Sequence, residues 1–465
     1  MRFEFLALAL AAAAVMPAQV KLPPFSKKTL PNGATLILLH KPDVPLITVR
    51  ALFRGGAEAE PAGQAGLNAL TVELMRRGAG DRSAGQFAEA LDALGATLVT
   101  GSDRQMSYAS LEFLAKTQNE ALDLFADFLA RPAFPEEEFN KALAQRIDAA
   151  KAAKDNPGAA IAHYFPSFFF GPGHPYGRPT AGDELSLAGI TRDGLAAWHK
   201  RMFNGRNLIL IAAGAIDEAT LTPRLEKLAG ALPAGEAYQW KAKTPAPAPK
   251  QPRLLLVDKP DATQTYFIIA MPGIDRTHPD RTRLEIVNTL FGGRFTSMLN
   301  DELRVNSGLT YGASSNVDED RLAGAIYIST YTPTETTVKA IDLALEVLNR
   351  LRTQGIDSEQ LLSARNYIKG GFPTRNLETA DQIATVLGEL EIFGLDRGEI
   401  DDYFSRLDAA TLEQINATAK KWFGAAPLQF LLVGNAAKIR EDVKKYAPNL
   451  RVQSIKDPGF GVPAF

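Results

Sequence analysis

The chain has 465 residues, a formal net charge of −2, hydrophobic side chains at 46% of positions and no cysteine. This length exceeds the roughly 250–300 residues at which a single core stops growing, so at least two soluble globular domains are expected. The near-neutral charge gives no reason to expect nucleic acid or an anionic membrane as a partner. The absence of cysteine excludes disulfides, thiolate catalysis and cysteine-bound zinc.

Residues 1–19 are predicted to be a signal peptide. Arg2 precedes an apolar run from Phe5 to Met16, which is too short to span a bilayer but suits the core of an export signal. Glu4 weakens the positive start of this segment, and the alternative is a cytosolic N-terminal helix. No other segment is apolar enough to cross a membrane, so we expect a periplasmic or secreted protein whose mature chain has no membrane span.

Short strands and long helices follow one another along the first half. Residues 34–40 and 46–53 have the β-branched and aliphatic composition of strands, and residues 97–114 look like two paired strands. A helix is predicted over 83–96, with Ser83 as its N-cap and Gly95 past its end, and two more over 117–134 and 135–157, each stopped by proline.

The second half repeats this order. It has a strand at 265–273, a long helix from Arg281, a strand at 323–332 and a helix over 336–355. Thr191 and Thr411, Phe203 and Phe423, and Gly214 and Gly434 each differ by 220 positions. Three matches at one offset, each in a helix–turn–strand context, indicate a tandem duplication.

The predicted fold is α+β, with two homologous sandwich domains, each a mostly antiparallel sheet with helices packed on one face. The domains are expected at 24–240 and 254–455. A Pro/Ala-rich linker at 241–253 joins them, and a tail follows at 456–465. Whether the tail docks on a partner is left open by the sequence.

This order of elements, together with the Gly66-Leu67 pair at the start of a helix, resembles the pitrilysin/insulinase-type zinc peptidases, or inverzincins, which include the processing peptidases. The mark of that family is H-x-x-E-H. Two histidines four residues apart share one helix face and hold Zn²⁺, and the glutamate activates the bound water. The resemblance covers nearly all of the predicted mature chain.

The zinc motif is missing from this sequence. Its His, Glu and His positions fall on Ala69, Val72 and Glu73, and no side chain of the first two can coordinate a metal. A third ligand is expected in the family near residues 148–150, which read Asp-Ala-Ala here. A site assembled from distant histidines stays open as an alternative, although no two of the five histidines can share one helical turn.

A second stretch that carries the resemblance is retained. Residues 290–315 contain a Gly292-Gly293 turn, Arg304, and Gly308-Leu309-Thr310-Tyr311. In the family, an arginine and a tyrosine at this spacing contact the substrate carbonyl and the tetrahedral intermediate, so the resemblance implies a catalytic role for Arg304 and Tyr311. Taken singly, Gly308 could be a helix C-cap, Arg304 a surface charge and Tyr311 a residue packed on the sheet.

Some members of the family divide these parts between two chains. The resemblance implies that this chain is the non-zinc-binding subunit of a heteromeric metallopeptidase. It would bind no zinc itself and would supply Arg304 and Tyr311 to a homologous H-x-x-E-H partner that carries the zinc. Peptides are the expected substrates, and Phe295 and Asn316 are weak candidates for contacting them. The alternative is a catalytically inert homologue that acts as a scaffold.

Overall fold

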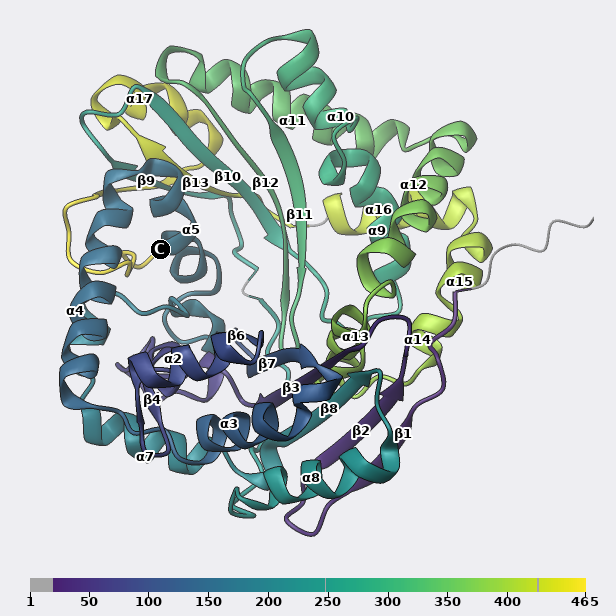
Figure 1. The fold of residues 1–465 in the computed structure, drawn as a ribbon. Helices are drawn as coiled ribbons and strands as arrows, with labels where there is room; N and C mark the ends of the chain where they lie inside the picture. Colours follow the sequence, from purple (N-terminus) through teal and green to yellow (C-terminus); the bar gives the residue numbers. More distant parts are fainter. Residues whose placement is uncertain (1–19, 247, 425) are drawn as a thin grey trace, which may run out of the picture.

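The computed structural model describes residues 20–246, 248–424 and 426–465. These residues form two halves, each built on a six-stranded sheet, with helices around both sheets (Figure 1). The predicted signal peptide lies outside the described residues. In the part of the chain that the structure covers, no helix combines the length and the apolar character needed to span a bilayer.

The sheet of the first half has the strand order β1-β2-β8-β3-β7-β6. Its pairs are antiparallel except for β2 and β8, which run parallel. The strands of this half are β1 (Ser26–Thr29), β2 (Thr35–His40), β3 (Leu46–Arg54), β6 (Thr97–Ser102), β7 (Met106–Leu114) and β8 (Leu208–Gly214), with a small hairpin of β4 (Gly78–Ala79) and β5 (Arg82–Ser83). Its helices are α1 (Leu67–Met75), α2 (Ala84–Ala93), α3 (Gln118–Ala130), α4 (Glu136–Ala152), α5 (Pro157–Phe170), α6 (Glu184–Ala188), α7 (Arg192–Met202) and α8 (Glu218–Gly230).

The sheet of the second half has the order β11-β12-β10-β13-β9-β14, again mostly antiparallel, with β9 parallel to both of its neighbours. Its strands are β9 (Arg253–Asp258), β10 (Gln264–Pro272), β11 (Ala313–Glu319), β12 (Gly324–Pro333), β13 (Gln429–Gly434) and β14 (Asn449–Ser454). Its helices are α9 (Arg281–Asn288), α10 (Met298–Asn300), α11 (Thr337–Gln354), α12 (Ser358–Asn376), α13 (Ala380–Phe393), α14 (Gly398–Asp401), α15 (Tyr403–Ala409), α16 (Leu412–Gly424) and α17 (Ala436–Val443).

The predicted fold is confirmed, duplication included. The series β2-β8-β3-β7-β6 and β9-β13-β10-β12-β11 have the same pairing directions, and Gly214 and Gly434 end the equivalent strands β8 and β13. The helix expected to run on from Arg281 is wrong in length. It ends at Asn288 and gives way to a wider π-helical turn, η6 (Thr289–Gly293), where a Cβ on Gly292 would lie 2.2 Å from the backbone nitrogen of Ser315.

Each half also covers the sheet of the other half with one helix, which the sequence analysis did not predict. Helix α5 of the first half packs on β10 and β13, and α13 of the second half packs on β3 and β8 (Figure 1). The alternation of β8 explains how this is possible. Ile209 and Ile211 face the core that contains α13, whereas Leu208 and Leu210 face the first half's own helices. The central strands of each sheet are therefore apolar and covered on both faces.

Two hairpin tips join the halves. Arg104, between β6 and β7, forms an ion pair with Asp320, between β11 and β12. The amide of Gln105 donates to Asp320 as well (2.8 Å), and to the Tyr176 hydroxyl (3.1 Å). That hydroxyl accepts the backbone N–H of Leu322 (3.0 Å). The two halves are thus connected by buried polar contacts in addition to the exchanged helices.

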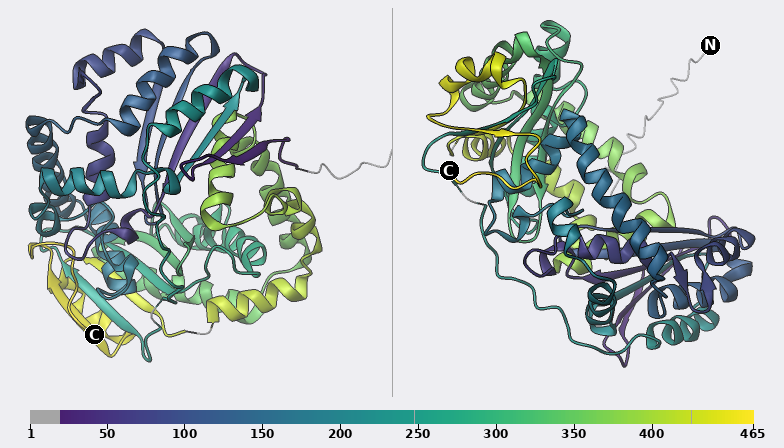
Figure 2. Two further views of the ribbon diagram at one scale, coloured as in Figure 1. Left: turned by 90° about the horizontal axis from the view of Figure 1, so that it is seen from below. Right: turned by 90° about the vertical axis from the view of Figure 1, so that its left-hand side faces the viewer.

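The segment between the halves has no regular secondary structure over residues 233–246 and 248–249, and Figure 2 shows it as a long, extended connection. It is nevertheless held near its middle by two lysines. Lys241 donates to the backbone oxygen of Glu58, and Lys243 forms an ion pair with Asp275 (2.8 Å). One contact is to the first half and one to the second, so the segment follows the junction.

The C-terminal tail docks on this chain itself. Phe460 is fully buried, stacks on His163 (ring centroids 4.6 Å apart) and meets Tyr164 edge-on (5.1 Å). Its backbone N–H donates to Asp183 (3.2 Å). The tail therefore runs from β14 of the second half onto α5 of the first.

Candidate functional site

Helix α1, which carries the positions of the zinc motif, is fixed at its start by buried polar contacts. The Glu60 carboxylate accepts the backbone N–H groups of Gly66 (3.2 Å) and Asn68 (2.7 Å), and burial raises its pKa to about 8. The Asn68 side-chain oxygen accepts from Trp198 Nε1 (3.1 Å) and Ser107 Oγ (2.9 Å). These bonds tie α1 to α7 and to β7.

The side chains at the motif positions do not fit a zinc ion. Ala69 and Val72 offer only hydrocarbon, and Glu73 is engaged by Arg146 of α4, whose Nε lies 2.7 Å from Glu73 Oε2. Arg146 also donates from Nη2 to the backbone oxygen of Ala69 (3.1 Å). A guanidinium thus lies across the helix face on which the family's motif places its metal ligands.

A cavity of about 590 Å³ opens beside this face. It lies between α1, α4, the start of α2 and the edge strand β6. The lining residues are Ala69, Val72, Glu73, Arg76, Arg77, Ala84, Ala88, Thr100, Gly101, Ser102, Arg146, Thr180 and Ala181. Three arginines and one glutamate are the charged groups among them, so the cavity wall is positive.

The histidines are spread over the chain and have local partners. His199 Nε2 donates to the backbone oxygen of Leu129 (3.0 Å), and burial lowers the pKa of His199 to about 4. His40 contacts the backbone oxygen of Ile216 (2.8 Å), and His174 that of Thr244 (3.0 Å). Across the described residues, no group of three His, Cys, Asp or Glu side chains is arranged to hold a metal ion.

In the second half, the structure brings Arg304, Tyr311 and Phe295 together. The guanidinium carbon of Arg304 lies 4.7 Å from the centroid of the Phe295 ring and 4.7 Å from that of Tyr311. Both rings are exposed, Phe295 at 65% and Tyr311 at 75%. A cation between two aromatic faces is a favourable arrangement, and it fixes the plane of the guanidinium.

The backbone around this cluster explains how it is positioned. Arg304 lies in the short π-helical segment η7 (Asp301–Asn306), which ends where Gly308 takes a φ of +64°. The N–H of Gly308 donates to the Arg304 backbone oxygen (3.1 Å). Gly308 therefore follows the C-cap Ser307, and its left-handed conformation directs the chain back so that Tyr311 reaches Arg304.

Asn300 holds the other ring. Its amide donates to the backbone oxygen of Phe295 (2.7 Å), and its side-chain oxygen accepts the backbone N–H of Ala313 (3.3 Å). Asn316, five positions beyond Tyr311 on β11, donates instead to Ser314 Oγ (3.3 Å). Of the two candidates for substrate contact, Phe295 belongs to the arginine cluster and Asn316 lies outside it.

The cluster and the cavity beside α1 lie apart in this chain. Figure 1 shows α10, which leads directly into η7, in the second half, well away from α2 and β6 at the cavity. Arg304 and Tyr311 thus do not reach over the motif positions of their own chain.

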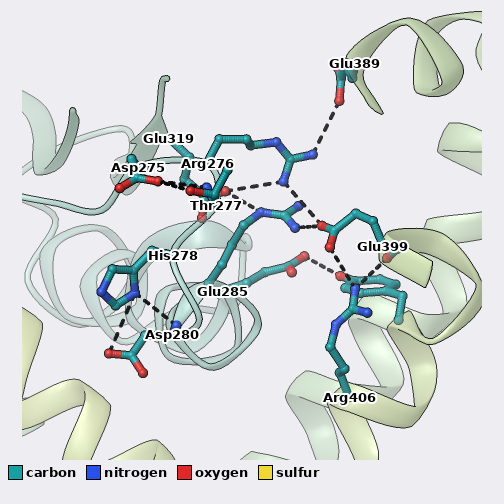
Figure 3. A network of polar contacts seen from close by, with 12 residues as sticks. Asp275, Arg276, Thr277, His278, Asp280, Glu285, Glu319, Glu389, Glu399 and Arg406 are labelled. Atoms are coloured by element: carbon teal, nitrogen blue, oxygen red, sulfur yellow. Dashed lines mark hydrogen bonds and ion pairs between the residues drawn. The ribbon is translucent and has the colours of Figure 1, made fainter. Parts of the chain in front are cut away.

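A second cavity, of about 380 Å³, lies under α13 and contains a dense ionic network (Figure 3). Arg276 lies 3.8 Å from Glu319, 3.5 Å from Glu389 of α13 and 3.6 Å from Glu399. Burial raises the pKa of Glu319 to about 7. The positive and negative groups face one another. The network therefore holds α13, the helix that covers the first half's sheet, against the rest of the second half.

The model of the family described as "Insulinase (Peptidase family M16)" matches residues 35–181, and that described as "Peptidase M16 inactive domain" matches residues 189–368. The chain belongs to the insulinase family of peptidases, M16. The family resemblance predicted from the sequence is confirmed.

Bacterial relatives of the M16 chain match over most of their length. An uncharacterized zinc protease of Mycobacterium leprae is 27% identical over 410 residues, which cover 86% of this chain and 91% of the relative. One of Bacillus subtilis is 23% identical over 396 residues, 85% of this chain and 95% of the relative.

Solved structures agree with the fold. A peptidase M16 inactive domain from Pseudomonas fluorescens superposes with a TM-score of 0.83 at 24% identity, covering 89% of this chain and 98% of the other. A protease from Helicobacter pylori gives a TM-score of 0.81 at 17% identity, covering 89% of this chain and 100% of the other.

Two functional groups were missed by the sequence analysis. Arg146 lies one helical turn before Ala150, where the family expects its third ligand, and Glu60 lies in the loop before α1. The sequence held a partial signal for Arg146, because Glu73, at the second histidine position of the motif, is a carboxylate beside apolar helix positions and favours a nearby cation. Nothing local in the sequence marks Glu60 as buried.

Proposed function

We propose that this M16 chain is the non-zinc-binding subunit of a heteromeric zinc metallopeptidase that cleaves peptides. The observation that carries the proposal is the state of Arg304. Its guanidinium is held between the rings of Phe295 and Tyr311. Within the described residues, none of its N–H groups donates to another side chain or backbone oxygen, and it has no carboxylate partner.

That arrangement suits the stabilisation of developing negative charge. Stacking fixes the guanidinium without using its hydrogen-bond donors, and the phenol of Tyr311 is also without a partner in the described part of the chain. Both groups can donate to the oxygen of a peptide carbonyl as it gains charge in the transition state. A surface arginine with only a structural role would more often be paired, as Arg146 is with Glu73.

The rest of the reaction would come from a second chain. The residues at the motif positions here do not fit zinc, so a homologous H-x-x-E-H subunit would carry the metal, and the metal would supply the activated water. The separation of Arg304 from the cavity beside α1 supports action in trans. The family membership supports peptides as substrates.

We further propose that the protein works in the periplasm or outside the cell. The support is the apolar run between Phe5 and Met16 with small residues after it. Sequencing the N-terminus of the protein recovered from the periplasmic fraction of its host tests this. A start near residue 19 is expected, and an intact Met1 on a cytoplasmic protein would refute it.

The test of function is a mixing experiment. This chain, a homologous H-x-x-E-H chain encoded in the same genome, and their mixture are assayed with a quenched fluorescent peptide. Activity is expected in the mixture above the sum of the two chains. Arg304→Ala or Tyr311→Phe should lower kcat about 10²–10³-fold, the usual effect of removing one donor to an oxyanion.

Matched controls are available on exposed surfaces elsewhere. Arg224→Ala on α8 and Tyr367→Phe on α12 remove the same groups outside the cluster and should leave the mixture's activity unchanged. If the mixture is active but indifferent to Arg304→Ala and Tyr311→Phe, the chain is a scaffold and the proposal fails. Chelator-sensitive hydrolysis by this chain alone would also refute it.

A further inference from the structure

The cavity beside α1 has an arrangement of charge that the proposed function does not use. Arg146 is tied to Glu73, but Arg76 and Arg77 at the end of α1 are not similarly engaged. Arg77 lies 3.9 Å from Glu73 and 3.8 Å from Glu138, beyond hydrogen-bond distance, and Arg76 has no ion-pair partner among the described residues. Two guanidinium groups can therefore each donate to a further anion.

Neutral donors line the same space. Thr100, Ser102 and Thr180 line the cavity, and in the described part of the chain none of their hydroxyl groups has a hydrogen-bond partner. Ala84, the first residue of the ten-residue helix α2, also lines the cavity, so the partially positive end of that helix lies at its wall. Glu73 is the single carboxylate among the described lining residues.

The neighbouring strand indicates what kind of molecule carries the anion. β6 is the last strand of its sheet and pairs with β7 on one side, so its other side presents backbone groups to the cavity. The cavity, at about 590 Å³, is larger than an inorganic ion needs. Arginine forks match carboxylates through two parallel hydrogen bonds.

We infer that this cavity binds a carboxylate group of an extended peptide, with Arg76 and Arg77 as the binding residues. The carboxylate comes either from an acidic side chain or from the peptide's C-terminus. Such a site would hold part of a peptide on this chain at a place remote from Arg304 and Tyr311. It goes beyond the proposed function, because it requires neither a partner chain nor cleavage.

Fluorescence anisotropy of labelled peptides with the full chain tests the inference. The probe is a short extended peptide with one central glutamate, compared with the same peptide carrying glutamine, each with a free or an amidated C-terminus. The glutamate peptide, or any peptide with a free C-terminus, should bind at least about tenfold more tightly than the amidated glutamine peptide. The four peptides distinguish the two sources of carboxylate, and equal binding by all four overturns the inference.

Three variants assign the binding to the cavity. The double variant Arg76→Gln/Arg77→Gln should bind the acidic peptide about tenfold more weakly, whereas Arg224→Gln on α8 should bind it as the parent does. Glu73→Gln, which removes the negative charge from the wall, should bind it several-fold more tightly, a gain that misfolding cannot produce. Unchanged affinity in the double variant, or unchanged or lower affinity in Glu73→Gln, overturns the inference. Because binding is measured on the isolated chain, its failure leaves the mixing experiment unaffected.

Discussion

Replacing Glu60 by glutamine is expected to remove a large part of the pH dependence of folding stability. Glu60 is 4% exposed, and its pKa rises from the usual 4.5 to about 8 because burial disfavours the charged form. The N–H groups of Gly66 and Asn68 stabilise the carboxylate only in part. The folded protein thus binds this proton more tightly than the unfolded chain does.

The sign and size follow from proton linkage. A carboxyl whose pKa is raised by folding lowers stability as the pH rises, and the loss begins near 4.5 and is complete above 8. Each pH unit in this window costs about 1.4 kcal/mol, so the loss approaches about 5 kcal/mol by pH 8. Glutamine has the same shape and no charge. The amide nitrogen of glutamine replaces the carboxylate oxygen that accepts the N–H of Gly66, and a nitrogen of this kind cannot accept that hydrogen bond. The substitution therefore lowers the free energy of unfolding by about 1–3 kcal/mol at every pH.

Thermal unfolding of both proteins from pH 5 to pH 9 measures this. The difference in Tm between Glu60→Gln and the parent should rise with pH by about 10 °C or more, for a unit of some 220 residues. Comparing the two proteins at one pH cancels shared titrations, including that of Asp103, whose pKa burial raises to about 6. A Tm difference that stays constant across the range would show that Glu60 is ionised in the folded protein, contrary to this reasoning.

Other predictions concern packing. Gly388→Val on α13 should destabilise the protein by about 1–3 kcal/mol, because a Cβ there would lie 2.9 Å from a methyl of Leu52. Gly370→Ala on α12, which has open space around it, should instead stabilise the protein by about 0.5–1 kcal/mol. The change in Tm measures both effects. Phe460→Ala should cost about 3–5 kcal/mol and speed digestion of the tail by carboxypeptidase, whereas Phe465→Ala, at 39% exposure, should cost under about 1 kcal/mol. A tail equally resistant in both variants would show that Phe460 does not anchor it.

Most strands and most helices of the fold could be predicted from local pattern. Ser83 is the N-cap of α2, as predicted, with a full capping box to Gln86. Helix α5 could not be predicted in the same way. It is apolar on nearly all sides, contains Pro166 and is buried in the other half's core, so it has neither an amphipathic stripe nor a local partner. The exchange of helices between halves depends on long-range packing that no window of sequence contains.

Only part of the candidate site could be predicted from the sequence. Arg304 and Tyr311 were found because the family resemblance marks their spacing, and their stacking with Phe295 depends on turns that short-range residues encode, above all Gly308. The cavity beside α1 could not be found from sequence. Its arginines come from the end of α1 and from α4, which are some 70 positions apart along the chain and meet only in the fold.

The pair of Arg146 and Glu73 explains why the cavity persists without metal ligands. Their side chains are 23% and 28% exposed, and ion pairs in contact with solvent contribute only about 0–1 kcal/mol, so the pair does little for stability. Its main effect is geometric. Arg146 is held along α1 by Glu73 and by the backbone of Ala69, which keeps the wall polar. The guanidinium groups of Arg76 and Arg77 make no hydrogen bond within the described part of the chain, although Arg77 lies 3.9 Å from Glu73 and 3.8 Å from Glu138. With an apolar residue in place of Arg146, Glu73 would be half-buried beside Val72 with only Arg77, 3.9 Å away, to balance its charge. Glu73, which stands at the second histidine position of the motif, thus pairs with Arg146, and Arg76 and Arg77 leave the cavity wall with a net positive charge.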